Sequence, residues 1–184
     1  MDLIDFDDHL GMVPAHQHVN PNGELGGWVA NTAGVSRRAI VEKLAKVAGS
    51  VTVWDYAEIL GKARIVGNAT IMEHAKICDS AIVGGYATVS GYAVVRGNAM
   101  VEEYALVKEH ANVCAWATVK GYAKVRDQAH IGGHAQVLGY AIARGTVVIA
   151  GHAILAGHAD YCSGRVMGDT EPTSKHIKKP ECHC

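Results

Sequence analysis

The residues in this chain best suited to chemistry are its eleven histidines. A histidine changes its charge near neutral pH, so it can act as a general base or bind a metal ion. His134 and His152 are 18 residues apart, and His158 follows shortly after. If the chain is an enzyme, these three are the candidates for its catalytic base.

Four tyrosines, Tyr86, Tyr104, Tyr122 and Tyr140, recur at the same interval of 18 residues. If 18 residues make one turn of a repeating structure, their rings lie above one another at about 4.8 Å. We expect this column to stiffen the fold by ring stacking. The alternative is a platform for the rings of a sugar or a base, which keeps the four tyrosines as candidate ligand-binding residues.

The end of the chain gathers side chains that zinc prefers as ligands. Cys162, His176, Cys182 and Cys184 offer thiolate and imidazole for a tetrahedral site, although their spacing is not that of a C-x-x-C knuckle. The alternative is a tail with reactive thiols. Zinc is the cofactor that this tail suggests, and apart from metal ions we expect none.

A strict six-residue period positions His134, His152, His158 and the four tyrosines. Stepping by six from Ala33 to Ala159, every residue is alanine except Val51 and Val147. Stepping by six from Val35 to Leu155, every residue is Val, Ile or Leu, with Ala143 as the exception. Six residues do not fit the helical period of 3.6, and the unit V-x-G-x-A-x suits a short strand followed by a corner. An unbroken period of this kind indicates a repeat architecture.

Three such units make a triangular coil of 18 residues, and about seven coils fill residues 33–161. The array resembles the left-handed parallel β-helix of hexapeptide-repeat proteins. With Gly23-Glu24-Leu25-Gly26-Gly27-Trp28-Val29 before the array, the chain also resembles the YdcK-like group of enterobacterial and prophage genomes. The predicted fold class is therefore all-β, a left-handed parallel β-helix with three strands per coil.

The repeat divides the chain into three segments. Residues 1–32 are predicted to be an N-terminal hairpin cap, because two extended runs flank Asn20-Pro21-Asn22-Gly23. Residues 33–161 form the β-helix, and residues 162–184 form a C-terminal tail that leaves the register. Within the cap, His16-Gln17-His18 resembles the H-x-H motif by which three chains of phage fibres hold an iron ion.

The outward residues of the strands predict how the molecule assembles. One face gathers the apolar residues Val66, Ile82, Met100, Leu138, Ile154 and Ala156. Such a surface is too apolar to remain in water, so we expect a homotrimer in which Val66, Ile82, Met100, Leu138 and Ile154 meet. A second face holds Lys108, Lys124, Arg126 and Arg144, which we interpret as a solvated basic stripe.

Composition excludes several classes of partner and compartment. The formal net charge is −1, so no bulk attraction draws the chain to nucleic acid or to a membrane. No basic, apolar leader is evident at the N-terminus, and five cysteines without an obvious pairing favour a reducing compartment. We expect the chain in the cytoplasm, or in a virion if a phage encodes it.

Two functions remain open at this stage. The first is a non-catalytic structural or binding module, trimeric and of the phage or prophage type, with a protein as its partner. The second is the acyltransferase activity that the hexapeptide-repeat resemblance implies, acting on a sugar or a small amine. Such enzymes place a histidine base near a protruding loop, and no loop interrupts residues 33–159. The sequence therefore favours the non-catalytic module.

Overall fold

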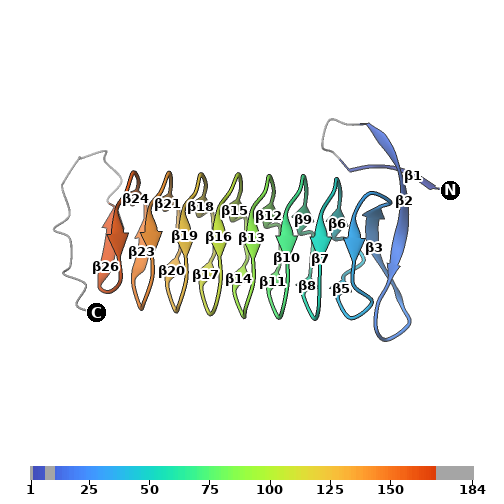
Figure 1. Ribbon diagram of the computed structural model, residues 1–184, viewed down its shortest axis with the longest axis horizontal. Helices are drawn as coiled ribbons and strands as arrows, with labels where there is room; N and C mark the ends of the chain where they lie inside the picture. The colour runs from blue at the N-terminus through green and yellow to red at the C-terminus, as the bar shows by residue number, and fades with distance from the viewer. Residues whose placement is uncertain (1, 7–10, 169–184) are drawn as a thin grey trace.

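The computed structural model describes residues 2–6 and 11–168 and contains, within them, strands and no helix. The strands stack into a parallel β-solenoid of about eight turns with three strands in each turn (Figure 1). The predicted parallel β-helix is thereby confirmed. The solenoid is one turn longer than the repeat register indicates, because strands on either side of residues 33–161 join its sheets.

Three sheets form the sides of the prism. Sheet A contains, in order of pairing, β1 (Asp2–Asp5), β2 (Met12–Val19), β3 (Leu25–Ala30), β6 (Lys46–Val47), β9 (Arg64–Ile65), β12 (Ile82–Val83), β15 (Met100–Val101), β18 (Thr118–Val119), β21 (Gln136–Val137) and β24 (Ile154–Leu155). Sheet B contains β4 (Gly34–Val35), β7 (Thr52–Val53), β10 (Thr70–Ile71), β13 (Thr88–Val89), β16 (Leu106–Val107), β19 (Lys124–Val125), β22 (Ile142–Ala143) and β25 (Asp160–Tyr161). Sheet C contains β5 (Ile40–Val41), β8 (Glu58–Ile59), β11 (Lys76–Ile77), β14 (Val94–Val95), β17 (Asn112–Val113), β20 (His130–Ile131), β23 (Val148–Gly151) and β26 (Arg165–Gly168).

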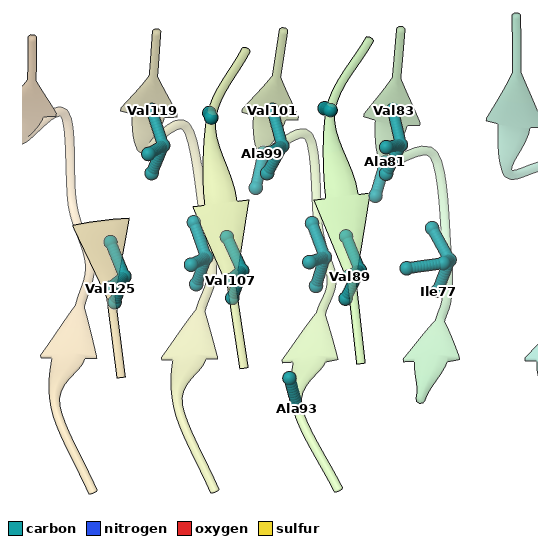
Figure 2. Close-up of a cluster of buried hydrophobic side chains, with 14 of the residues drawn as sticks. Ile77, Ala81, Val83, Val89, Ala93, Ala99, Val101, Val107, Val119 and Val125 are labelled. Atoms are coloured by element: carbon teal, nitrogen blue, oxygen red, sulfur yellow. The ribbon is translucent and has the colours of Figure 1, made fainter. Parts of the chain in front are cut away.

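The interior is a stack of small aliphatic side chains (Figure 2). In each unit the in-register Ala and the Val, Ile or Leu two residues later point inward, as Ala105 and Val107 do with exposed fractions of 1% and 0%. Their neighbours Tyr104 and Leu106 face outward. Strands 18 residues apart pair in parallel, so that Val89 lies beside Val107. Each inward side chain therefore packs against its equivalent one coil away.

Every corner between 55 and 157 places one residue in the left-handed region of φ. At that position φ lies between 55° and 77°, whether the residue is glycine or not. The seven non-glycine residues are Asp55, Glu73, Asp79, Glu103, Glu109, Ala115 and Asp127. Glycine adopts this conformation without a steric penalty, whereas another residue is strained there.

Acidic side chains offset this strain by bonding to the next coil. The Glu109 Oε2 accepts the amide N–H of Asp127 at 2.7 Å, and the Asp127 Oδ2 accepts that of Gly145 at 2.6 Å. Glu73 and Asp79 accept the amides of Gly91 and Gly97 in the same way. The bond from Gly145, followed by the interaction with Glu109, lowers the pKa of the Asp127 carboxyl. Acidic corners are thus links between coils.

The N-terminal segment covers the first coil at two sheet edges. β2 pairs antiparallel with β3, which itself pairs in parallel with β6 and so begins sheet A. A Cβ on Gly26 would clash with the carbonyl of Val41, and one on Gly27 with the carbonyl of Ala45. The two glycines before Trp28 are therefore required by close backbone packing.

Two polar side chains form hydrogen bonds with main-chain groups at the open edge of β5. The Asn20 Oδ1 accepts the amide of Val41 at 2.9 Å, while its Nδ2 donates to the Val41 carbonyl at 3.2 Å. The buried ring of His18 donates from Nε2 to the carbonyl of Ala39 at 3.0 Å. Since an unpaired strand edge invites further pairing, these bonds protect this end of the solenoid.

After β1, the edge strand of sheet A, the chain brings Phe6 onto the outer face of that sheet. Phe6 is fully buried in a small cluster with Ala15, Ala30 and Ala48, against which Val66 also packs. The Arg64 guanidinium donates to the Phe6 carbonyl at 2.9 Å. Val66, predicted to lie at a trimer contact, thus already packs within its own chain.

We expect Ala105→Leu to destabilise the protein by about 1–3 kcal/mol, because three added carbons overpack a coil interior that holds only small side chains. Lys124→Leu is the matched control, since Lys124 points outward between Leu106 and Ile142 in sheet B. Denaturant unfolding of both variants measures the difference. Equal stability of the two variants would contradict the tight interior.

Candidate functional site

The four predicted tyrosines form a continuous ladder at the corner between sheets A and B. The ring centroids of Tyr86, Tyr104, Tyr122 and Tyr140 lie 4.9–5.2 Å apart, and neighbouring planes differ by 3–5°. His158 extends the ladder at 5.1 Å from Tyr140. The tyrosines are about half exposed.

The other two corners carry shorter ladders. Between sheets B and C, Tyr and His alternate in the order Tyr56, His74, Tyr92 and His110, with centroids 4.9–5.3 Å apart. Between sheets C and A, the ring of Trp116 stacks on His134, and His134 stacks on His152. Each ladder is a direct consequence of placing aromatic residues 18 positions apart.

Stacking determines what such a ladder can bind. An inner ring such as Tyr104 has a neighbouring ring on each side at about the coil spacing, which leaves no room for a ligand ring between them. The exposed parts are ring edges and phenol hydroxyls, which can form hydrogen bonds. A sugar or base could stack face-on only at the end of a ladder. The guanidinium carbon of Arg38 occupies one such end, 5.6 Å from the Tyr56 centroid.

A shallow groove follows the alternating ladder between sheets B and C. It has a volume of about 290 Å³ and is lined by Asp55, Tyr56, Glu73, His74, Gly91 and Tyr92. Ring edges and carboxylates thus share one surface. The sequence columns indicated the stacking but not the groove.

The three candidate catalytic histidines are divided between two corners. His134 and His152 are stacked, with centroids 4.9 Å apart and planes 4° apart. His158 belongs to the tyrosine ladder at another corner. The structure therefore brings the first two together and leaves the third apart.

The predicted zinc site lies largely outside the residues that the structure describes. His176, Cys182 and Cys184 lie outside them, so the zinc site with Cys162 stays a prediction. In the cap, the exposed His16 contacts the Asn31 side chain at 2.8 Å, whereas His18 is buried against Ala39. Across residues 2–6 and 11–168, no group of three or more His, Cys, Asp or Glu is arranged to hold a metal ion.

The sequence analysis did not predict one contact between a cysteine and a histidine. Cys114 and His130 lie side by side on sheet C, with 3.7 Å between Sγ and Nε2. Cys114 follows the inward Val113, whereas His130 precedes the inward Ile131 of the next coil. The two residues are therefore 16 positions apart, and a comparison of residues 18 positions apart does not pair them.

Comparison of the chain with protein-family models, with curated proteins and with solved structures finds no match. The part of the chain that the structure describes has no helix long and apolar enough to cross a membrane.

We expect the cap to lose stability as the pH falls. Burial lowers the pKa of His18 from its ordinary value of about 6.5; the hydrogen bond to the Ala39 carbonyl opposes this shift, and the nearby charge of His16 adds to it. The unfolded chain therefore binds the proton more readily, so the stabilising contribution is complete above about pH 6.5 and declines below it.

Denaturant unfolding and amide exchange of β2 at several pH values between about 5 and 8 measure this effect. His18→Gln keeps a donor near the Ala39 carbonyl but does not titrate, so its stability should depend less on pH in this window. An unchanged pH dependence in this variant would exclude His18 as the cause.

Proposed function

We propose that the chain is a non-catalytic structural or binding β-helix module that assembles as a homotrimer. The observation that carries this proposal is the uniformity of the solenoid. From β4 to β25 each strand begins six residues after the previous one, without an inserted loop. An acyl-donor cleft needs a wall beside the coil surface, and the repeated corners supply none.

The ladders support a mechanical role. Each corner is held by main-chain bonds from coil to coil, such as Tyr104 N–H to Gly121 O at 2.9 Å, and by stacked rings. Aromatic pairs add about 0.5–1.5 kcal/mol each beyond burial. The result is a stiff rod whose tyrosine ladder offers one hydroxyl per coil to a repetitive protein partner. The resemblance to the YdcK-like prophage group supports a virion or assembly component.

The outer face of sheet A supports self-association. Phe6 covers its first coils, and beyond them the face presents Ile82, Met100, Leu138 and Ile154. The charges of Lys120 and Glu102 on this face pair with each other at 2.7 Å. A threefold contact would bury the remaining apolar surface.

The alternative, an acyltransferase acting on a sugar or a small amine, has the stacked pair His134 and His152 in its favour. A neutral imidazole can accept a proton from an attacking hydroxyl or amine. His158 would need a second site at another corner.

We expect light scattering to give a mass of about three chains for the wild-type protein. Met100→Glu should dissociate it, because three carboxylates would meet near one axis beside Glu102. Thr88→Glu, on the outer face of sheet B, is the matched control and should leave the mass unchanged. A monomeric wild-type protein would refute the trimer.

We expect acetyl-coenzyme A to leave the melting temperature unchanged, since a ligand that binds the native state must raise it. Thermal shift assays over a range of concentrations test this. A clear shift that is abolished by His134→Ala or His152→Ala, but not by His110→Ala in another ladder, would establish the transferase instead.

A further inference from the structure

Sheet C carries a cysteine and a histidine in contact on its outer face. Cys114 follows β17 and His130 begins β20, one coil later. Both side chains are partly buried, and their Sγ and Nε2 atoms are 3.7 Å apart. At this distance the imidazole can accept the thiol proton, which leaves a thiolate, the nucleophilic form of cysteine.

Gly132 makes room for this contact. A Cβ at this position would lie 3.3 Å from the Cys114 Sγ and 3.2 Å from the His130 Nε2, which would crowd both atoms. The backbone does not require glycine here, because Gly132 is outside the positive-φ corners and equivalent positions hold Arg96 and Ala150. The absence of a side chain therefore serves the Cys–His contact.

The surroundings of the pair suit an anionic reagent. Arg96 occupies the same column as Cys114 one coil earlier, and its side chain is exposed. Burial, followed by the charge of Arg96, lowers the pKa of His130. This shift favours the neutral ring, which is the form that can accept a proton, while it reduces the basicity of the ring.

We propose that Cys114 and His130 form a thiol-exchange site for small anionic disulfides. The Cys114 proton moves to the His130 Nε2, and the sulfur attacks one sulfur atom of the small disulfide. The S–S bond of the reagent breaks, and one half leaves as a thiolate that takes the proton from His130. The other half stays on Cys114 as a mixed disulfide. The cysteine is oxidised and the reagent is reduced, so no further reactant is needed.

The chain contains a matched control for this reaction. Cys78 lies on the same face in an equivalent position, two coils before Cys114, and is also a free, partly buried thiol. Where Cys114 has His130, Cys78 has Val94, and where Cys114 has Gly132, Cys78 has Arg96. Burial, followed by the charge of Asp79, raises the pKa of the Cys78 thiol. Cys78 therefore lacks the base and resists ionisation.

The experiment treats the full chain with a limiting amount of glutathione disulfide at pH 7, stops the reaction with acid, and measures modification of the two peptides by mass spectrometry. We expect Cys114 to react at least about tenfold faster than Cys78, as thiolate fraction and access determine the rate. Since both cysteines are in one molecule, this comparison does not depend on any variant. Equal rates would overturn the proposal.

Reciprocal variants then test the role of His130. His130→Val should bring the rate of Cys114 to within about twofold of that of Cys78, and Val94→His should raise the rate of Cys78. Both changes lie on the outer surface, and melting temperatures verify that the coils remain folded. An unchanged rate at Cys114 in His130→Val would show that the histidine does not activate the thiol. The inference does not depend on the trimer or on the absence of acyl transfer.

Discussion

The narrow interior of the coil is the constraint on which the rest of the structure depends. Each coil is closed by three short strands, so the side chains that point inward meet near one axis. Residues such as Ala105 and Val107 have no exposed surface and pack against equivalents one coil away. A larger side chain in one coil would displace its neighbours above and below. The alternation of Ala with Val or Ile follows from this geometry.

The corners show that the closed coil also determines the arrangement of the surface residues. Every corner from Asp55 to Gly157 takes one residue with positive φ. At four of the six acidic corners, the carboxylate accepts an amide of the next coil, as that of Asp127 does from Gly145. The residue that follows stands outward at a fixed height, so aromatic residues stack into ladders. Strain, hydrogen bonding and stacking are therefore repeated together along each edge.

The sequence was sufficient for the solenoid and for the ladders because both depend on a fixed spacing. The period predicted which residues are buried, and an interval of 18 predicted the contact of Tyr104 with Tyr122. It did not predict that Phe6 packs on the outer face of sheet A, because that contact follows no period and joins segments far apart in the chain. The Cys114–His130 contact was also missed, since it links two different positions of the unit.

Repetition also explains where chemistry can occur on such a molecule. A uniform coil presents columns of like residues, and a column such as the tyrosine ladder occupies its own ring faces and leaves edges for binding. A reactive site needs unlike residues side by side, and this requires a departure from the consensus unit. Gly132 is one such departure, because it removes a side chain where the backbone permits one and allows a thiol and an imidazole to meet. On a fold built from identical units, positions that break the repeat without a backbone reason are therefore the places to look for function.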